Sequence, residues 1–173
     1  MLKEVHIDIG GGRSADYFVS MASVDKQGTY VVLDPEEFRC PYTTMYPNLR
    51  LVRWGANEKG TWELPFADSS IFEANINFIY DCVGWSGCDR RKAYDSIIKS
   101  LKRVLKPDGV IYVREPQCTI ESLAERFKEH DFQVTEPFLL EKGVSETSIF
   151  MRRLSKDFLN WGYSPMLFEA RLG

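Results

Sequence analysis

The residues best suited to bind a ligand lie in one short run, Asp8 to Gly12, which reads Asp-Ile-Gly-Gly-Gly. This run ends a β-rich stretch and precedes residues 14–23, for which the pattern predicts a helix with Ser14 as its N-cap. Glycines have no Cβ atom, so a ligand can approach the backbone closely. The free amides at a helix start attract an anionic group. The run is therefore a candidate binding turn, although a tight turn without a ligand remains an alternative.

A second candidate is the carboxylate of Asp34, which follows an apolar, strand-like run at residues 29–33. It lies about 20 residues beyond Ala15, and Gly10, Gly12 and Ala15 match the dinucleotide fingerprint G-x-G-x-x-A. A carboxylate at this place can accept both hydroxyl protons of an adenosine ribose. These features predict an adenosine-containing cofactor whose polar end lies near the glycines. Alternatively, Asp34 is simply the first residue of an Asp-Pro-Glu turn and has no role in binding.

Strand-like and helix-like patterns alternate along the chain, which predicts a mostly parallel sheet covered on both faces. The strands are expected at residues 5–9, 29–33, 49–54, 75–80, 110–113, 132–140 and 147–154, and the helices at 14–23, 91–105 and 120–130. The last two strands have a short link, so they must be antiparallel. The prediction is an α/β, doubly wound, seven-stranded sheet over residues 1–154, with one antiparallel strand near the edge. Residues 155–173 form an apolar tail expected to pack on this domain or on another chain.

Composition and charge argue against several classes of function and site. The 173 residues are 44% hydrophobic and 27% charged, as in a globular protein. A net charge of −3 argues against broad electrostatic binding of nucleic acid. The four cysteines form no CxxC pair and there are only two histidines, so we expect no metal site. Without a membrane-length apolar run or a signal-peptide pattern, the chain is expected to be cytoplasmic.

Four segments in a fixed order resemble the class I S-adenosylmethionine-dependent methyltransferases, and in particular their small, methyltransferase type 11-like members. They are His6–Gly12, Val32–Asp34, Leu64–Ser70 and Leu101–Gly109. Each motif is degenerate by itself, but four in order with matching spacing are specific. The resemblance implies a Rossmann-like fold, S-adenosyl-L-methionine as the cofactor and methyl transfer as the activity.

The resemblance also implies roles for individual residues. The methionine end of the cofactor would lie against Asp8, Gly10, Gly11 and Gly12, and the ribose against Asp34. Trp54 and Asn57 would lie near the adenine. Tyr80 and Asp81 would face the methyl group, with Asp81 as a base where the nucleophile carries a proton.

The chain departs from the family pattern in three places. Ser14 replaces a glycine, no acid follows the third expected strand, and the N-terminal helices that often cover the substrate site are missing. An open site would suit a large acceptor or one presented by a partner, and the tail could join two copies of the chain. The same departures support an alternative, a non-catalytic methyltransferase-like binding or assembly module. A nicotinamide-dependent oxidoreductase is a third reading, motivated by Gly10, Gly12 and Ala15.

Overall fold

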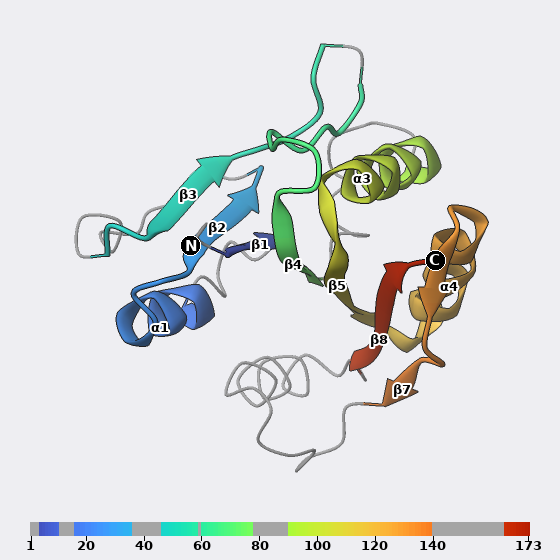
Figure 1. The fold of residues 1–173 in the computed structure, drawn as a ribbon. Coiled ribbons are helices and arrows are strands. Elements are labelled where there is room, and N and C mark those ends of the chain that lie inside the picture. Colours follow the sequence, from blue (N-terminus) through green and yellow to red (C-terminus); the bar gives the residue numbers. More distant parts are fainter. Residues whose placement is uncertain (1–3, 11–15, 36–45, 59, 78–89, 140–164) are drawn as a thin grey trace.

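The computed structural model describes residues 4–10, 16–35, 46–58, 60–77, 90–139 and 165–173. In these residues eight strands form one sheet with the order β3-β2-β1-β4-β5-β8-β6, and β7 pairs with β8 (Figure 1). The strands are β1 (Val5–Ile9), β2 (Thr29–Asp34), β3 (Leu49–Arg53), β4 (Ile71–Asn77), β5 (Leu105–Pro116), β6 (Phe132–Val134), β7 (Phe138–Leu139) and β8 (Pro165–Leu172). The helices are α1 (Asp16–Val24), α3 (Arg90–Val104) and α4 (Gln117–Glu129).

The sheet is doubly wound, as the strand–helix alternation predicted. Strands β3, β2, β1, β4 and β5 are parallel, and β8 is antiparallel to its neighbours. The chain builds β2 and β3 on one side of β1 and then β4 and β5 on the other. The topological switch point therefore lies between β1 and β4, where ligands bind in open α/β sheets.

The C-terminal strand differs from the prediction. Residues 165–172 were expected in a tail outside the sheet, but as β8 they lie between β5 and β6 and pair with both. The sheet thus contains eight strands in the described residues, not seven. Residues 147–154, the expected closing strand, lie outside the described residues. The expected strand at 132–140 is divided into β6 and β7.

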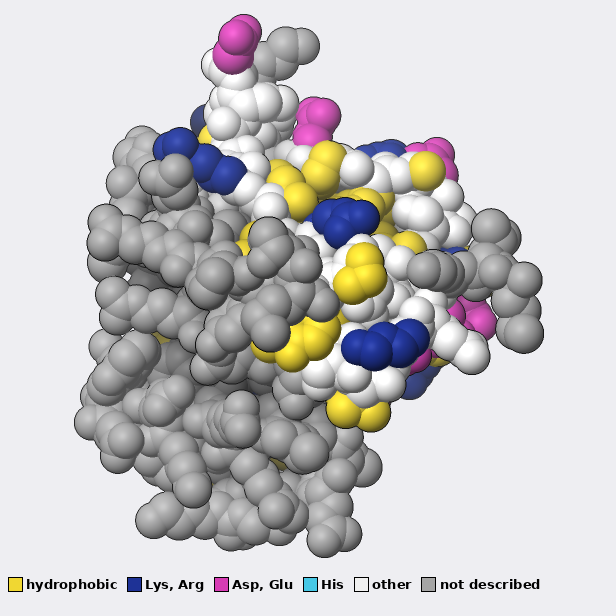
Figure 2. Space-filling model, turned by 90° about the vertical axis from the view of Figure 1, so that its left-hand side faces the viewer, with side chains coloured by type: hydrophobic (Ala, Val, Ile, Leu, Met, Phe, Trp, Pro, Cys, Tyr) yellow, Lys and Arg dark blue, Asp and Glu magenta, His cyan; other side chains and the backbone are white. Residues whose placement is uncertain are grey.

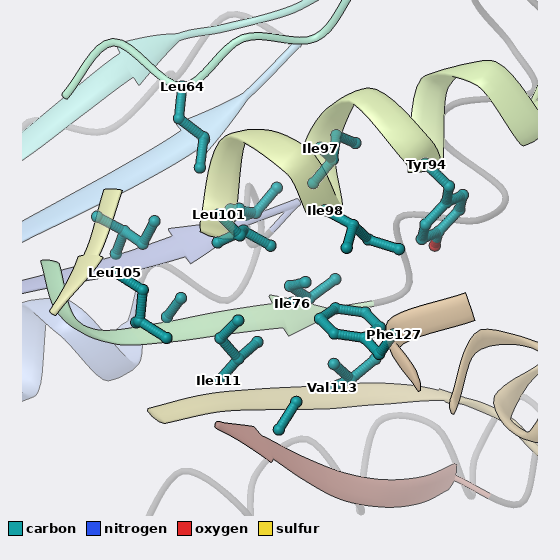
Figure 3. Packing of buried hydrophobic residues seen from close by; sticks show 14 of the residues in the cluster. Leu64, Ile76, Tyr94, Ile97, Ile98, Leu101, Leu105, Ile111, Val113 and Phe127 are labelled. Carbon is teal, nitrogen blue, oxygen red and sulfur yellow. The ribbon is translucent and has the colours of Figure 1, made fainter. Parts of the chain in front are cut away.

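The larger core lies between one face of the sheet and helices α3 and α4 (Figure 3). The predicted apolar face of α3 is confirmed, because Tyr94, Ile97, Ile98 and Leu101 are buried against the sheet. Helix α1 covers the opposite face over β2 and β3, where Phe18 packs with neighbours from these strands. Strand β2, which ends in Asp34, is therefore packed on both faces.

Strand β8 closes the larger core through Phe168, which is fully buried and packs edge-on against Phe127 of α4 with the ring centroids 5.4 Å apart. We predict that Phe168→Ala lowers the free energy of unfolding by about 3–5 kcal/mol because it leaves a cavity. Arg171→Ala, on the exposed side of the same strand, should change it by no more than about 0.5 kcal/mol. Urea unfolding measures both. Equal effects would contradict the placement of β8 in the sheet.

Candidate functional site

Four polar side chains lie together on the α1 side of the sheet, on strands β1, β4 and β5. We call them the polar layer: Asp8, Asn75, Asn77 and Arg114, all at most 3% exposed. Alternate residues of a strand point to opposite faces, so Asp8 points away from the core that takes its neighbours Ile7 and Ile9. The parallel register places Asp8 beside Asn75, and Asn77 beside Arg114.

Hydrogen bonds connect the side chains of the polar layer, and each bond has a defined donor and acceptor. Asn77 Nδ2 donates to Asp8 Oδ1 at 2.7 Å. Arg114 Nη1 donates to Asn77 Oδ1 at 2.8 Å, and Arg114 also reaches Asn75 Oδ1 at 3.2 and 3.3 Å. Because a guanidinium can only donate, it turns the amide oxygen of each asparagine toward itself. The amide nitrogen of Asn77 is left to face Asp8.

The network continues from Asn75 toward the amino ends of the strands. Asn75 Nδ2 donates to Glu73 Oε1 at 2.8 Å, and His6 Nδ1 lies 3.4 Å from Glu73 Oε2. Burial of Glu73 opposes its ionisation, but hydrogen bonds from His6 and Asn75 outweigh burial and hold its pKa below the usual value. Glu73 therefore adds a negative charge to this side of the sheet at neutral pH.

The carboxyl group of Asp8 has a strongly raised pKa. Its Oδ2 is buried, and no group in the described part of the chain gives that oxygen a hydrogen bond. Burial raises the pKa of Asp8 from 3.8 to about 7, although the hydrogen bond from Asn77 and the charge of Arg114 lower it. The charges of Asp34 and Glu73 raise it further. A cation beside Oδ2 would supply the missing partner and favour the ionised carboxyl.

Gly10 and Asp34 lie at the carboxyl edge of the sheet, where β1, β2 and β4 end. The amide of Gly10 donates to the carbonyl oxygen of Leu33 at 2.9 Å, and its φ of +81° is one that glycine tolerates best. Asp34 is the last residue of β2 and is 6% exposed. Asn77, the hydrogen-bond partner of Asp8, is the last residue of β4. The edge thus brings together the carboxylates of Asp8 and Asp34 and the backbone of Gly10 at the switch point.

Trp54 and Asn57, the two residues expected near the adenine, differ in burial and in hydrogen-bond partners. Trp54 follows β3, and its amide donates to the carbonyl oxygen of Asp34 at 2.8 Å. Its ring is buried edge-on against Trp62, and Nε1 donates to the carbonyl oxygen of Glu63. Asn57 is exposed, and its Oδ1 accepts a hydrogen bond from the amide of Thr61 at 3.1 Å. Contacts of Trp54 and Asn57 with an adenine stay predictions.

The other expected site residues, Gly11, Gly12, Tyr80 and Asp81, lie outside the described residues. Conversely, sequence reasoning missed Asn75, Asn77 and Arg114. The available signal was the alternation Glu-Ala-Asn-Ile-Asn at residues 73–77, which puts three polar residues on one face of β4; the expected strand began only at residue 75.

The described part of the chain has the following features with respect to metal, membrane and basic sites. It contains no group of three or more His, Cys, Asp or Glu side chains that could hold a metal ion. None of its helices combines the length and the apolar character needed to cross a membrane. On the face drawn in Figure 2, the described Lys and Arg side chains lie apart from one another among hydrophobic ones.

The raised pKa of Asp8 predicts how the free energy of unfolding depends on pH. The unfolded carboxyl ionises near pH 4, but the folded one only near pH 7, so the contribution of Asp8 to stability falls as the pH rises between these values. Asp8→Asn keeps an acceptor for Asn77 and cannot ionise. We predict that the variant and the parent agree near pH 4, and that the variant is more stable by up to about 4 kcal/mol at pH 8. Urea unfolding across this range measures the difference, and a constant difference would contradict the raised pKa.

Comparison with known proteins identifies solved structures with a similar fold. No protein-family model and no curated protein sequence matches the chain. Among solved structures, a SAM-dependent methyltransferase from Aquifex aeolicus matches with a TM-score of 0.62 and 15% identity, over 99% of this chain and 85% of that chain. The 16S rRNA methyltransferase KamB matches with a TM-score of 0.62 and 14% identity, over 99% and 88%. A complex of the Haloferax volcanii Trm112 methyltransferase activator with a methyltransferase also matches, with a TM-score of 0.62 and 14% identity over 98% and 82%. The chain therefore has the Rossmann-like fold of the class I SAM-dependent methyltransferases.

Proposed function

We propose that the chain binds S-adenosyl-L-methionine at the carboxyl edge of its sheet and transfers the methyl group to an acceptor by in-line displacement. The observation that carries this proposal is the Oδ2 atom of Asp8, a buried carboxylate oxygen without a described partner at the switch point of a methyltransferase fold.

Asp8 fits the ammonium group of the cofactor's methionine end. A buried carboxylate without a cation is unfavourable, so the charge of a bound ammonium group stabilises both partners. The Oδ1 atom already accepts from Asn77, which leaves Oδ2 for the ligand. Gly10, with Gly11 and Gly12 after it, would let the same part of the cofactor approach the backbone.

Asp34 fits the ribose. It ends the strand next to β1, and its charge acts on Asp8. One carboxylate can accept hydrogen bonds from both ribose hydroxyls. Asp8 and Asp34 would then hold the two ends of one adenosine-containing molecule, with Trp54 and Asn57 near its adenine.

The bound cofactor would supply a methyl group activated by its sulfonium. The protein's own contribution is to bind and align the reactants, and alignment can lower a barrier by about 7–11 kcal/mol. We assign the acceptor side to Tyr80 and Asp81, because they follow Asn77 of β4 within a few residues along the chain. Tyr80 would contact the acceptor, and Asp81 would take a proton where the nucleophile carries one.

The acceptor is proposed to be large or presented by a partner. KamB is a 16S rRNA methyltransferase, and the Haloferax methyltransferase is in complex with an activator, so a large acceptor and a partner protein each occur with this fold. Association of two copies through the C-terminal tail would have to use residues 155–164, because β8 is paired along both edges. A location in the cytoplasm agrees with the free, exposed thiol of Cys118.

Two other functions remain to be separated from this one. A nicotinamide dinucleotide would bring an anionic pyrophosphate toward the glycine turn, where the buried carboxyl of Asp8 disfavours an anion. A non-catalytic module would keep the fold but would not bind the cofactor. Cofactor binding therefore decides among the three.

We predict that S-adenosylmethionine or S-adenosylhomocysteine at a hundred times its dissociation constant stabilises the protein by about 2.7 kcal/mol, which raises Tm by several degrees. Asp34→Ala should lose this shift, because the ribose contact is removed. Asp108→Ala, at an exposed aspartate near the start of β5, should keep it. Thermal unfolding measures all three proteins. No shift in the parent at millimolar ligand would contradict the proposal, and a shift with nicotinamide dinucleotide alone would favour the oxidoreductase.

The pH dependence of binding gives a second prediction. Because the ammonium group requires an ionised Asp8, affinity should rise about tenfold per pH unit up to about pH 7. It should fall again above about pH 8, where an α-amino group loses its proton. Asp8→Asn should weaken binding and remove the acidic limb of the profile. Titration calorimetry in buffers of different ionisation enthalpy measures both the affinity and the protons released.

A further inference from the structure

The geometry points to a positioning role for two residues that do not touch the proposed ligand. We infer that Arg114 fixes the amide of Asn77, and that Asn77 holds Oδ1 of Asp8, so that Oδ2 alone is presented to the cationic end of the ligand. This inference rests on the proposed function for the identity of the ligand. Its structural part, that Arg114 acts on Asp8 through Asn77, can be tested on the protein without any ligand.

The first argument is the direction of the hydrogen bonds. An asparagine amide has two orientations, which differ in whether oxygen or nitrogen faces a given neighbour. Arg114 Nη1 lies 2.8 Å from Asn77 Oδ1, so only the orientation with the oxygen toward Arg114 is stable. The nitrogen then donates to Asp8 Oδ1 at 2.7 Å. Without Arg114, the reversed amide would set its oxygen against the carboxylate.

The second argument is the anchoring of Arg114 itself. Its guanidinium also contacts Asn75 Oδ1 at 3.2 and 3.3 Å, and Asn75 in turn donates to Glu73 at 2.8 Å. Arg114 is therefore fixed by two asparagines of one strand. A planar group held at several points loses little further freedom when the site is used, which is the requirement for a preorganised site.

The third argument is charge. Among the described groups, Arg114 on β5 is the cation that acts on Asp8, whereas Asp34 on β2 and Glu73 on β4 are the anions that oppose its ionisation. Arginine stays charged at any working pH. Arg114 therefore keeps a fraction of Asp8 ionised in a fully buried place, and it does so without occupying Oδ2.

The test compares Arg114→Met and Arg114→Lys with Arg126→Met. Arg126 is a half-buried arginine of α4 that pairs with Asp95 at 3.1 Å, so it controls for the loss of an arginine from the core boundary. The ligand-free readout is the titration of the Asp8 carboxyl carbon by NMR. The second readout is the affinity for S-adenosylhomocysteine and S-adenosylmethionine between pH 5.5 and pH 8.

For Arg114→Met we expect the Asp8 titration to move up by about one pH unit or more, with about a tenfold loss of affinity at pH 7. The acidic limb of the binding profile should move by the same amount. Arg114→Lys keeps the charge but not the planar fork, so the titration should stay near that of the parent while affinity falls at every pH. Arg126→Met should alter neither readout.

If Arg114→Met does not fold, Asn77→Ser and the double variant Asp8→Asn/Arg114→Met test whether Arg114 acts on Asp8 through Asn77. Asn77→Ser should also raise the Asp8 titration, and the double variant should be more stable than Arg114→Met because no unpaired buried carboxyl remains. An Asp8 titration that is unchanged in Asn77→Ser, together with an affinity that is unchanged in Arg114→Lys, would overturn the inference. Failure of the parent to bind either ligand would overturn the proposed function instead, and the NMR titration would still decide the role of Arg114.

Discussion

The burial of one carboxyl group, that of Asp8, constrains the structure around the switch point. A buried carboxyl needs hydrogen bonds and a nearby cation, and the chain supplies them from strands that are remote in sequence. Asn77 of β4 and Arg114 of β5 meet this need on one side of the group. On the other side, Oδ2 has no partner among the described residues, and we propose that a ligand supplies one. The order β1-β4-β5 in the sheet is what brings the three together.

The two faces of the same strands have separate tasks. Toward α3 and α4 the strands present isoleucine, valine and alanine side chains, whose burial holds the sheet together. Toward α1 the central strands present the polar layer, which contributes less to stability but gives the carboxyl edge its chemistry. A polar layer survives inside a fold only when nearly all of its groups are paired. The exception is Oδ2 of Asp8, which has no partner among the described residues and lies at the topological switch point.

The sequence predicted the candidate site in part. The strand, the glycine turn and the acid after the second strand identified Asp8, Gly10 and Asp34, because these depend on local order along the chain. Residues that depend on neighbours from other strands were missed, as Asn77 and Arg114 demonstrate. The family resemblance implied a place near the adenine for Trp54. Its ring packs against Trp62 in the structure, and a contact with adenine stays a prediction.

By itself, the sequence determined the alternation of strands and helices, the apolar face of α3 and the glycine that follows β1. These features rest on periodicity and on the conformational freedom of single residues, both of which are local properties. Only the tertiary structure decided that residues 165–172 lie between β5 and β6, and that Asp8 meets Asn77 across 69 residues of chain. Strand order and register depend on the packing of both faces at once, so no single stretch of the sequence contains them.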